Sequence, residues 1–223
     1  INSIKRIVKR IVVIDSFSED KTVQLAEELG AEVHKHEFFN YSKQYMYAVE
    51  TAKVKTKWIL RIDADERLTR ESADELEKLC NDNMNSDVTG IVLRFYNVFM
   101  EKPIKHGGMY PWKKLSVYKT GVGNIENRNM DEHIILDYGK VIESKKDSKH
   151  LAFRGLSFFT NKCNWYSTRE AMDYFEHLKI DKKNSNFKTR IKMNIYYKLP
   201  MGFRAWIYYI YRYYLRLGFL DGR

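Results

Sequence analysis

Apolar and polar residues along the first part of the chain follow patterns that predict strands and helices in alternation. Three short apolar runs are typical of buried strands, and three longer stretches place apolar side chains at helical spacing. In chain order we expect a strand at 10–15, a helix at 18–30, a strand at 31–35, a helix at 42–52, a strand at 57–63 and a helix at 69–80. This alternation predicts an α/β fold with a mainly parallel sheet flanked by helices.

Polar residues at the ends of the predicted helices support these assignments. Ser18 or Asp20 would cap the first helix, and Gly30 would end it. Thr69 would cap the helix that follows the third strand.

Carboxylates follow two of the predicted strands directly. Asp15 closes the first strand, and the third strand runs into Asp63, Asp65 and Glu66. Ligands bind beyond the carboxyl ends of such strands, so Asp15 and Asp63 would face one crevice if their strands are neighbours. Crowded carboxylates favour a nearby cation, and Mg²⁺ or Mn²⁺ is held by one or two carboxylates together with substrate phosphates. The alternative is a capped turn, in which Asp63 or Asp65 accepts hydrogen bonds from backbone amides.

The composition allows a folded core and limits the other classes. With 223 residues and 44% hydrophobic content, the chain can form one large domain or a domain with an appendage. The two cysteines, Cys80 and Cys163, stand in unrelated settings and support neither a disulfide framework nor a cysteine metal site. The sequence has no spanning apolar run and no cleavable signal pattern, so we expect a reducing, cytoplasmic environment.

Positive charge is concentrated at the C-terminal end. The formal net charge is +10, and residues 182–223 hold ten of the 39 Lys and Arg but one of the 29 Asp and Glu. The chain therefore divides into a nearly neutral body and a strongly basic end. A nucleic-acid surface is the rival interpretation of this mixture of basic and aromatic residues, but it leaves the carboxylates unexplained.

A helix is predicted between Pro200 and Gly218, with Gly218 ending it at Leu217. Arg204, Arg212 and Arg216 form a narrow cationic stripe, and aromatic and aliphatic side chains cover most of the remainder. At about 24 Å the helix is shorter than a hydrocarbon core of about 30 Å, so it would lie in the interface of an anionic membrane. The alternative is that this helix packs onto the body.

Several stretches of the sequence resemble those of a known family. VVIDSFSEDKTVQLAEELGAEV, followed by WILRIDADERL, resembles the nucleotide-sugar half of family 2 glycosyltransferases, which are inverting enzymes with a GT-A fold. Further on, GGMYPW, NRNMDEHIIL, KHLAFRGLSFFTNKCNWYSTREAMDYF and RYYLRLGFLDG resemble a bacterial branch that builds lipopolysaccharide cores and related surface glycans. The resemblance implies a Rossmann-like GT-A domain at 1–150, which binds nucleotide-sugar and acceptor, and a helical, basic, membrane-facing region at 151–223.

The same resemblance assigns roles to single residues. Asp15 matches the acid that contacts the nucleotide base, and Asp63, Ala64 and Asp65 match the metal-binding DxD triplet, with Asp65 nearest the diphosphate. His150 resembles a histidine that approaches the metal or the diphosphate in some relatives. For the neighbouring pair Lys113 and Lys114 we favour solvent-exposed surface positions over contacts with phosphate.

An inverting sugar transfer also needs a base that removes the proton of the acceptor hydroxyl, and a carboxylate is suited to this role. Asp131 matches the catalytic aspartate of the family in one alignment of the MDEH motif, and Glu132 matches it in another; we favour Asp131. The alternative is that Asp131, Glu132 and His133 form a local salt-linked turn.

Taken together, the resemblance implies transfer of a sugar from a nucleotide donor, expected to be a uridine diphosphate (UDP) sugar, with Mg²⁺ or Mn²⁺. The acceptor would be a glycolipid or oligosaccharide at the inner face of the cell membrane, and no nucleic acid is expected as a partner. A nucleotidyltransferase on a similar core is a second rival. Family members begin with a strand that precedes a helix matching NSIKRIVKR (2–10), so we expect this chain to start in that helix without the strand.

Overall fold

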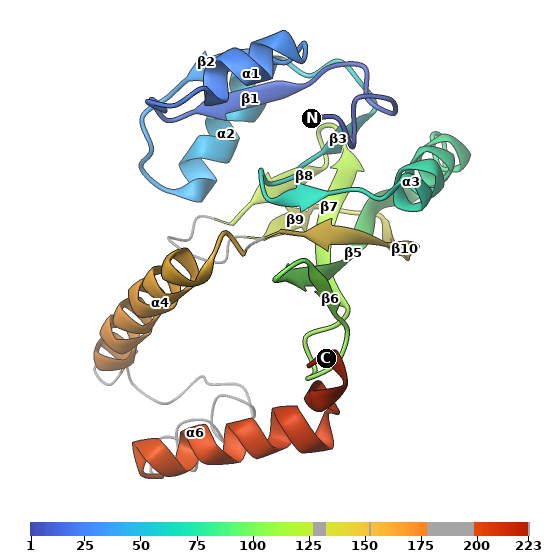
Figure 1. Ribbon diagram of the computed structural model, residues 1–223. Coiled ribbons are helices and arrows are strands. Elements are labelled where there is room, and N and C mark those ends of the chain that lie inside the picture. The colour runs from blue at the N-terminus through green and yellow to red at the C-terminus, as the bar shows by residue number, and fades with distance from the viewer. Residues whose placement is uncertain (127–132, 152, 178–198, 223) are drawn as a thin grey trace. The chain divides into compact units, whose positions relative to one another are not determined.

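The computed structural model describes residues 1–126, 133–151, 153–177 and 199–222, which form two compact units (Figure 1). Unit 1 comprises residues 1–96 and 111–150, and unit 2 comprises residues 97–110 and 151–223. Unit 2 therefore combines a short segment from the middle of the sequence, residues 97–110, with the C-terminal part of the chain.

The strands are β1 (Val12–Asp15), β2 (Glu32–Lys35), β3 (Trp58–Leu60), β4 (Glu66–Arg67), β5 (Val88–Phe99), β6 (Lys102–Ile104), β7 (Trp112–Lys119), β8 (Gly123–Ile125), β9 (Ile134–Leu136) and β10 (Lys140–His150). The helices are α1 (Thr22–Glu28), α2 (Tyr41–Ala52), α3 (Arg70–Asp82), α4 (Leu156–His177), α6 (Met201–Ile210), the π-helix η3 (Tyr211–Leu215) and the 3-10 helix η4 (Gly218–Asp221).

The α/β class is confirmed, with helices beside a central sheet and a C-terminal helical extension. The strand directions, however, are mixed. Only the pair β1 and β2 is parallel among the pairings with a defined register, whereas β3 with β7, β5 with β7 and β10 with β4 are antiparallel. The alternating pattern of residues 10–80 predicted parallel strands. The strands β5 and β7 follow that region in the sequence, and they pair antiparallel with each other.

The central sheet has the order β3, β7, β5, β10, β4, with β6 paired to β5, and β1 and β2 form a separate two-stranded sheet. The strands that end near Asp15 and Asp63 are therefore not hydrogen-bonded neighbours. A shared crevice for Asp15 and Asp63 was expected only if their strands were neighbours, and these two strands belong to separate sheets.

Local signals placed the helices of unit 1 correctly. Thr69 caps α3 by accepting a hydrogen bond from the Ser72 amide at 3.1 Å. For α1 neither expected cap is correct, because the N-cap position is Lys21, which makes no side-chain cap bond. Asp20 accepts from the Thr22 amide at 2.9 Å just before the helix, and Ser18 turns back to Asp15. The expected helix at 2–10 is wrong, because the structure shows turns at residues 2–7 and no regular helix from 8 to 10.

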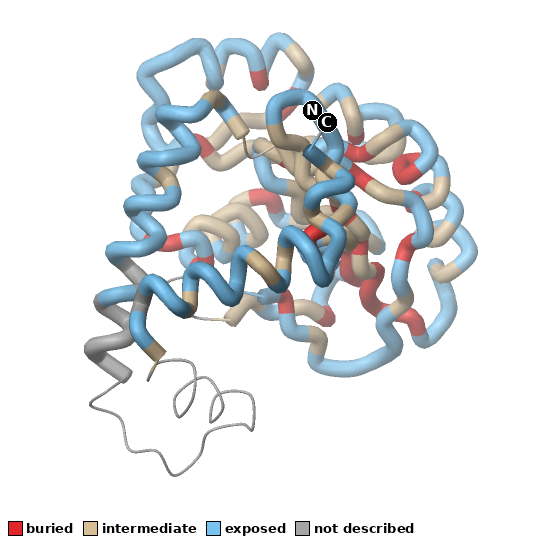
Figure 2. The backbone as a smooth tube through the Cα atoms, turned by 60° about the horizontal axis from the view of Figure 1, so that its bottom comes forward, coloured by how far each residue is buried: buried red, intermediate tan, exposed pale blue. Residues whose placement is uncertain are grey.

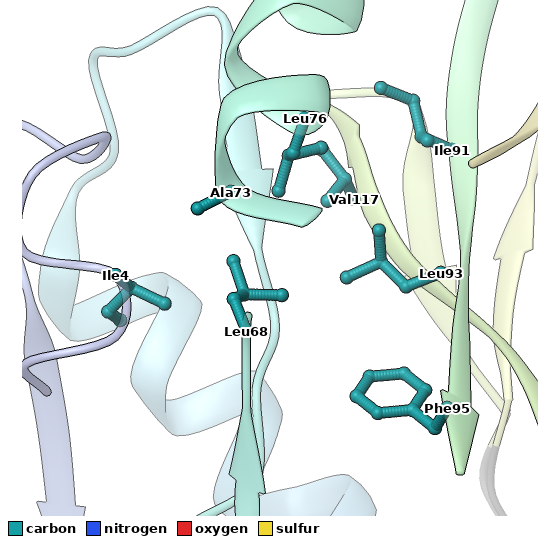
Figure 3. Close-up of a cluster of buried hydrophobic side chains, with 8 residues drawn as sticks. All are labelled: Ile4, Leu68, Ala73, Leu76, Ile91, Leu93, Phe95 and Val117. Atoms are coloured by element: carbon teal, nitrogen blue, oxygen red, sulfur yellow. The ribbon is translucent and has the colours of Figure 1, made fainter. Parts of the chain in front are cut away.

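The core of unit 1 lies between α3 and the central sheet (Figure 3). Ala73 and Leu76 of α3 belong to the same cluster as Leu93 of β5, and all three side chains are buried. The remaining buried members of the cluster are Ile4, Leu68, Ile91, Phe95 and Val117. Burial of these apolar side chains packs α3 against the central sheet, which also contains β3 and β4 on either side of the carboxylate turn.

In unit 2 the C-terminal residues hold the loop that follows β6. Asp221 accepts hydrogen bonds from the amides of Lys105 and His106, and its second oxygen lies 2.7 Å from Nδ1 of His106. Arg212 Nε donates to the Gly107 carbonyl at 2.8 Å, and the Gly107 amide donates to the Arg216 carbonyl at 2.9 Å. Arg212, a member of the expected cationic stripe, thus makes a hydrogen bond within unit 2.

The C-terminal helix begins after Pro200 as expected, but it changes to π-helical geometry at Tyr211, and Leu217 takes the left-handed conformation expected of Gly218. Most of the residues of α4 and α6 whose burial is described are exposed (Figure 2), and large aromatic side chains such as Trp165 of α4 and Trp206 of α6 contribute to that surface, as does Tyr214 of η3. Among the described residues, no helix combines the length and the apolar character needed to cross a membrane.

Candidate active site

The turn between β3 and β4 carries the three carboxylates of the RIDADER stretch. Asp63 and Glu66 brace this turn from both ends: the Glu66 amide donates to the Asp63 carbonyl at 3.0 Å, and the Asp63 amide donates to Glu66 Oε2 at 2.9 Å. Glu66 is 4% exposed, whereas Asp63 is exposed. The capped-turn interpretation is therefore correct for the backbone, and Glu66 is a capping residue that the sequence did not predict.

Lys114 of β7 joins the two bracing residues. Its ammonium nitrogen lies 2.6 Å from Asp63 Oδ2 and 2.8 Å from Glu66 Oε1, and its side chain is 15% exposed. The surface position expected for Lys114 is wrong, while Lys113 is 47% exposed and pairs with Glu143 at 2.7 Å. Successive residues of a strand point to opposite faces, so one of the two lysines had to turn inward.

Burial dominates the electrostatics of Glu66. Removing this carboxyl from water raises its pKa, and the negative charge of Asp63 acts in the same direction, while the Lys114 ammonium opposes both. Lys114 is therefore the main local source of positive charge that favours the ionised form of Glu66.

Asp65, the third carboxylate of the turn, lies close to His150 at the end of β10. Asp65 Oδ2 lies 3.4 Å from His150 Nε2, and both side chains are about a quarter exposed, at 26% and 21%. The position of His150 is fixed because it pairs with Glu66 across β10 and β4, and its ring lies 5.0 Å from the Trp112 ring, between centroids. The structure thus brings together two of the residues that the sequence singled out from distant segments.

The donor set at this point fits a divalent cation whose remaining ligands come from a substrate. A carboxylate oxygen suits both Mg²⁺ and Mn²⁺, whereas an imidazole nitrogen suits a transition-metal ion such as Mn²⁺ better than Mg²⁺, and the remaining positions would be taken by phosphate oxygens and water. Within the described ranges, no group of three or more His, Cys, Asp or Glu side chains could hold a metal ion alone. Asp65 and His150 are therefore the pair that could hold an ion shared with a diphosphate.

Asp15 has a different environment at the end of β1. Its carboxylate accepts hydrogen bonds from the hydroxyl at 2.5 Å and the amide at 2.9 Å of Ser18, and the residue is 4% exposed. These bonds, led by the one from the hydroxyl, outweigh burial and lower the pKa of Asp15. The carboxylate is thus held ionised in a tight turn, and its contact with a nucleotide base stays a prediction.

The candidate bases Asp131 and Glu132 lie outside the described residues. They fall between β8 and β9, which pair in antiparallel register from Gly123 with Leu136 to Ile125 with Ile134. His133, the neighbour in the motif, lies with Nδ1 3.2 Å from Glu126 Oε2. His133 thus extends the hairpin of β8 and β9.

The sequence placed Glu66 in the carboxylate cluster and Lys114 at the surface, and it assigned neither residue a role in this site. The signal for Glu66 was its position one residue beyond the DxD triplet, where the strand resumes. For Lys114 the only signal was that two neighbouring residues of a strand point to opposite faces of the sheet. This indicates that one of Lys113 and Lys114 turns inward, but it does not say which.

The fold is that of an α/β enzyme domain, and its acidic turn carries the candidate site. The chain belongs to Glycosyl transferase family 2, whose family model matches residues 1–175, and it is therefore a family 2 glycosyltransferase. It is 30% identical over 203 residues to an uncharacterised glycosyltransferase of Rickettsia felis, covering 86% of this chain and 69% of the relative. A Rickettsia conorii glycosyltransferase is also 30% identical, with 86% and 70% covered, and one from Rickettsia prowazekii is 27% identical over 201 residues, with 86% and 67% covered.

Proposed function

We propose that the chain transfers one sugar, with inversion, from a UDP-sugar to a glycolipid or oligosaccharide acceptor during synthesis of lipopolysaccharide or a related surface polysaccharide. The observation that carries this proposal is the meeting of Asp65 with His150 at 3.4 Å, beside the turn braced by Lys114. Membership of family 2 supports a nucleotide-sugar donor, and the bacterial surface-glycan branch rests on the sequence resemblance.

In this mechanism Asp65 and His150 would hold Mg²⁺ or Mn²⁺, which neutralises the charge of the departing nucleoside diphosphate when bound. Asp63 stays with Lys114, and Asp15 orients the nucleotide base. Asp131, or Glu132 in the second alignment, accepts the proton of the acceptor hydroxyl as that oxygen attacks the anomeric carbon. The nucleoside diphosphate leaves from the opposite face of the sugar, which gives inversion.

We further propose that unit 2 binds the cytoplasmic face of an anionic membrane as a peripheral surface. The exposed aromatic residues Trp206, Tyr209 and Tyr214 of α6 and η3 support this, because tyrosine and tryptophan favour the headgroup region of a bilayer. The basic composition of the C-terminal part adds attraction to anionic lipid. An acceptor carried by a lipid would then reach the enzyme at the membrane surface.

The test is a screen of nucleotide-sugars with Mn²⁺, read as release of nucleoside diphosphate in the presence of lipid or oligosaccharide acceptors. We expect Asp65→Ala to abolish release and Asp131→Asn to lower it by about 10²- to 10⁴-fold, as for loss of a general base. Full turnover of Asp131→Asn with loss in Glu132→Gln would assign the base to Glu132. Steeply salt-dependent binding of oligonucleotides without any Mn²⁺ requirement, and no turnover, would refute the proposal in favour of nucleic-acid binding.

A further inference from the structure

The ammonium group of Lys114 lies where a metal ion shared by Asp63 and Glu66 would otherwise stand. Its nitrogen lies within hydrogen-bond distance of one oxygen from Asp63 and one from Glu66, and both carboxylates come from the same short turn. Arg61 adds a weaker contact, with Nε 3.9 Å from the other oxygen of Asp63. Two of the three carboxylates in this turn therefore already face positive charge from the protein.

This arrangement separates the two aspartates of the DxD triplet. Asp63 is engaged by Lys114 at 2.6 Å, whereas Asp65 lies against His150. A divalent ion placed between Asp63 and Glu66 would stand at the site of the ammonium group, and like charges at such short range repel strongly. Asp65, which lies against His150, is the place proposed above for a divalent ion.

We propose that Lys114 is a positioning residue that acts as a resident cation. It keeps Asp63 and Glu66 from binding metal, confines a single divalent ion to Asp65 and His150, and reduces the negative charge that a nucleoside diphosphate meets. This inference rests on the function proposed above, and it assigns to a lysine of β7 a role that the DxD triplet alone does not contain. Lys114 acts through the carboxylates and does not itself need to touch the substrate.

The proposal predicts opposite effects on two ligands when the charge is removed. In Lys114→Met, Asp63 and Glu66 lose their ammonium partner, so we expect Mn²⁺ alone to bind at least about tenfold more tightly or with a second equivalent. UDP in the presence of Mn²⁺ should bind about 10- to 100-fold more weakly, because the ion is drawn away from Asp65 and the site is more negative. A purely structural role would weaken both ligands together.

The measurements are electron paramagnetic resonance titration of free Mn²⁺ and calorimetric titration of UDP, on the whole chain. Lys113→Met is the matched control, because it removes the same charge from the next residue of the strand, where Lys113 pairs with Glu143 instead. We expect this control to match the wild type in both titrations, and Lys114→Arg to stay within about threefold of it, since the charge is kept. Wild-type Mn²⁺ affinity in Lys114→Met, or equal loss of both ligands, would overturn the proposal.

A second substitution decides the question if Lys114→Met does not fold. Asp63→Asn should change Mn²⁺ affinity by less than about threefold, because Asp63 is held by Lys114, whereas Asp65→Ala should lower it by more than about tenfold. Equal losses in the two variants would contradict the assignment. Should the wild type bind no UDP with Mn²⁺, the proposed sugar transfer fails, but tighter Mn²⁺ binding in Lys114→Met would still support the role of the lysine.

Discussion

The cap of α3 allows a quantitative prediction about the scaffold of the site. The Thr69 hydroxyl accepts from the Ser72 amide at 3.1 Å and donates to the Asp147 carbonyl at 2.9 Å, so one oxygen joins the start of α3 to β10. Replacing Thr69 by Ala removes both bonds. Loss of a helix cap costs about 1 kcal/mol, and loss of a further hydrogen bond costs about 1 kcal/mol, which gives about 2 kcal/mol in the free energy of unfolding.

For a chain of this length, about 2 kcal/mol corresponds to a fall of about 4–8 °C in the melting temperature of the transition that includes α3. Far-ultraviolet circular dichroism during heating, with a urea titration beside it, measures the change. Thr69→Ser keeps the hydroxyl and should melt within about 2 °C of the wild type, while Thr69→Val keeps the shape and should behave like Thr69→Ala. If Thr69→Ser and Thr69→Ala are destabilised equally, the hydrogen bonds of the hydroxyl do not carry the effect and the reasoning is refuted.

Two further predictions concern the ends of the molecule. Because Ser18 lowers the pKa of Asp15 in the folded state, the stability from this carboxylate is fully present above its ordinary pKa of about 4 and is lost as the pH falls through the lower folded value. Ser18→Ala should therefore reduce the pH dependence of the melting temperature in this acid range, and an unchanged profile would contradict the assignment of the pKa shift to Ser18. For the membrane surface, Trp206→Ser should weaken co-sedimentation with anionic vesicles about tenfold, because a large exposed aromatic group no longer enters the interface. Leu25→Ser, at a similarly exposed apolar position on α1, should not affect vesicle binding, and equal loss in both variants would argue against a specific surface on unit 2.

Some features of the fold were readable from local sequence because local interactions cause them. The caps and apolar spacing placed α2 and α3, and the run before Asp63 placed β3, since these signals act within a few residues. The directions of the later strands were not readable, because they depend on how β5, β7 and β10 pair across long sequence separations. The helix at 2–10 was expected from the family resemblance, and turns at residues 2–7 stand in its place, so the resemblance alone did not decide their conformation.

The candidate site divides in the same way. The sequence by itself determined that a buried strand ends in a cluster of carboxylates, and this requires a compensating positive charge. It could not determine where that charge comes from. Only the tertiary structure decided that Lys114 lies against Asp63 and Glu66 and that His150 lies against Asp65, because β7 and β10 reach this turn through sheet pairing. Hydrogen-bond register across strands sets which side chains meet, and that register is a property of the folded chain as a whole.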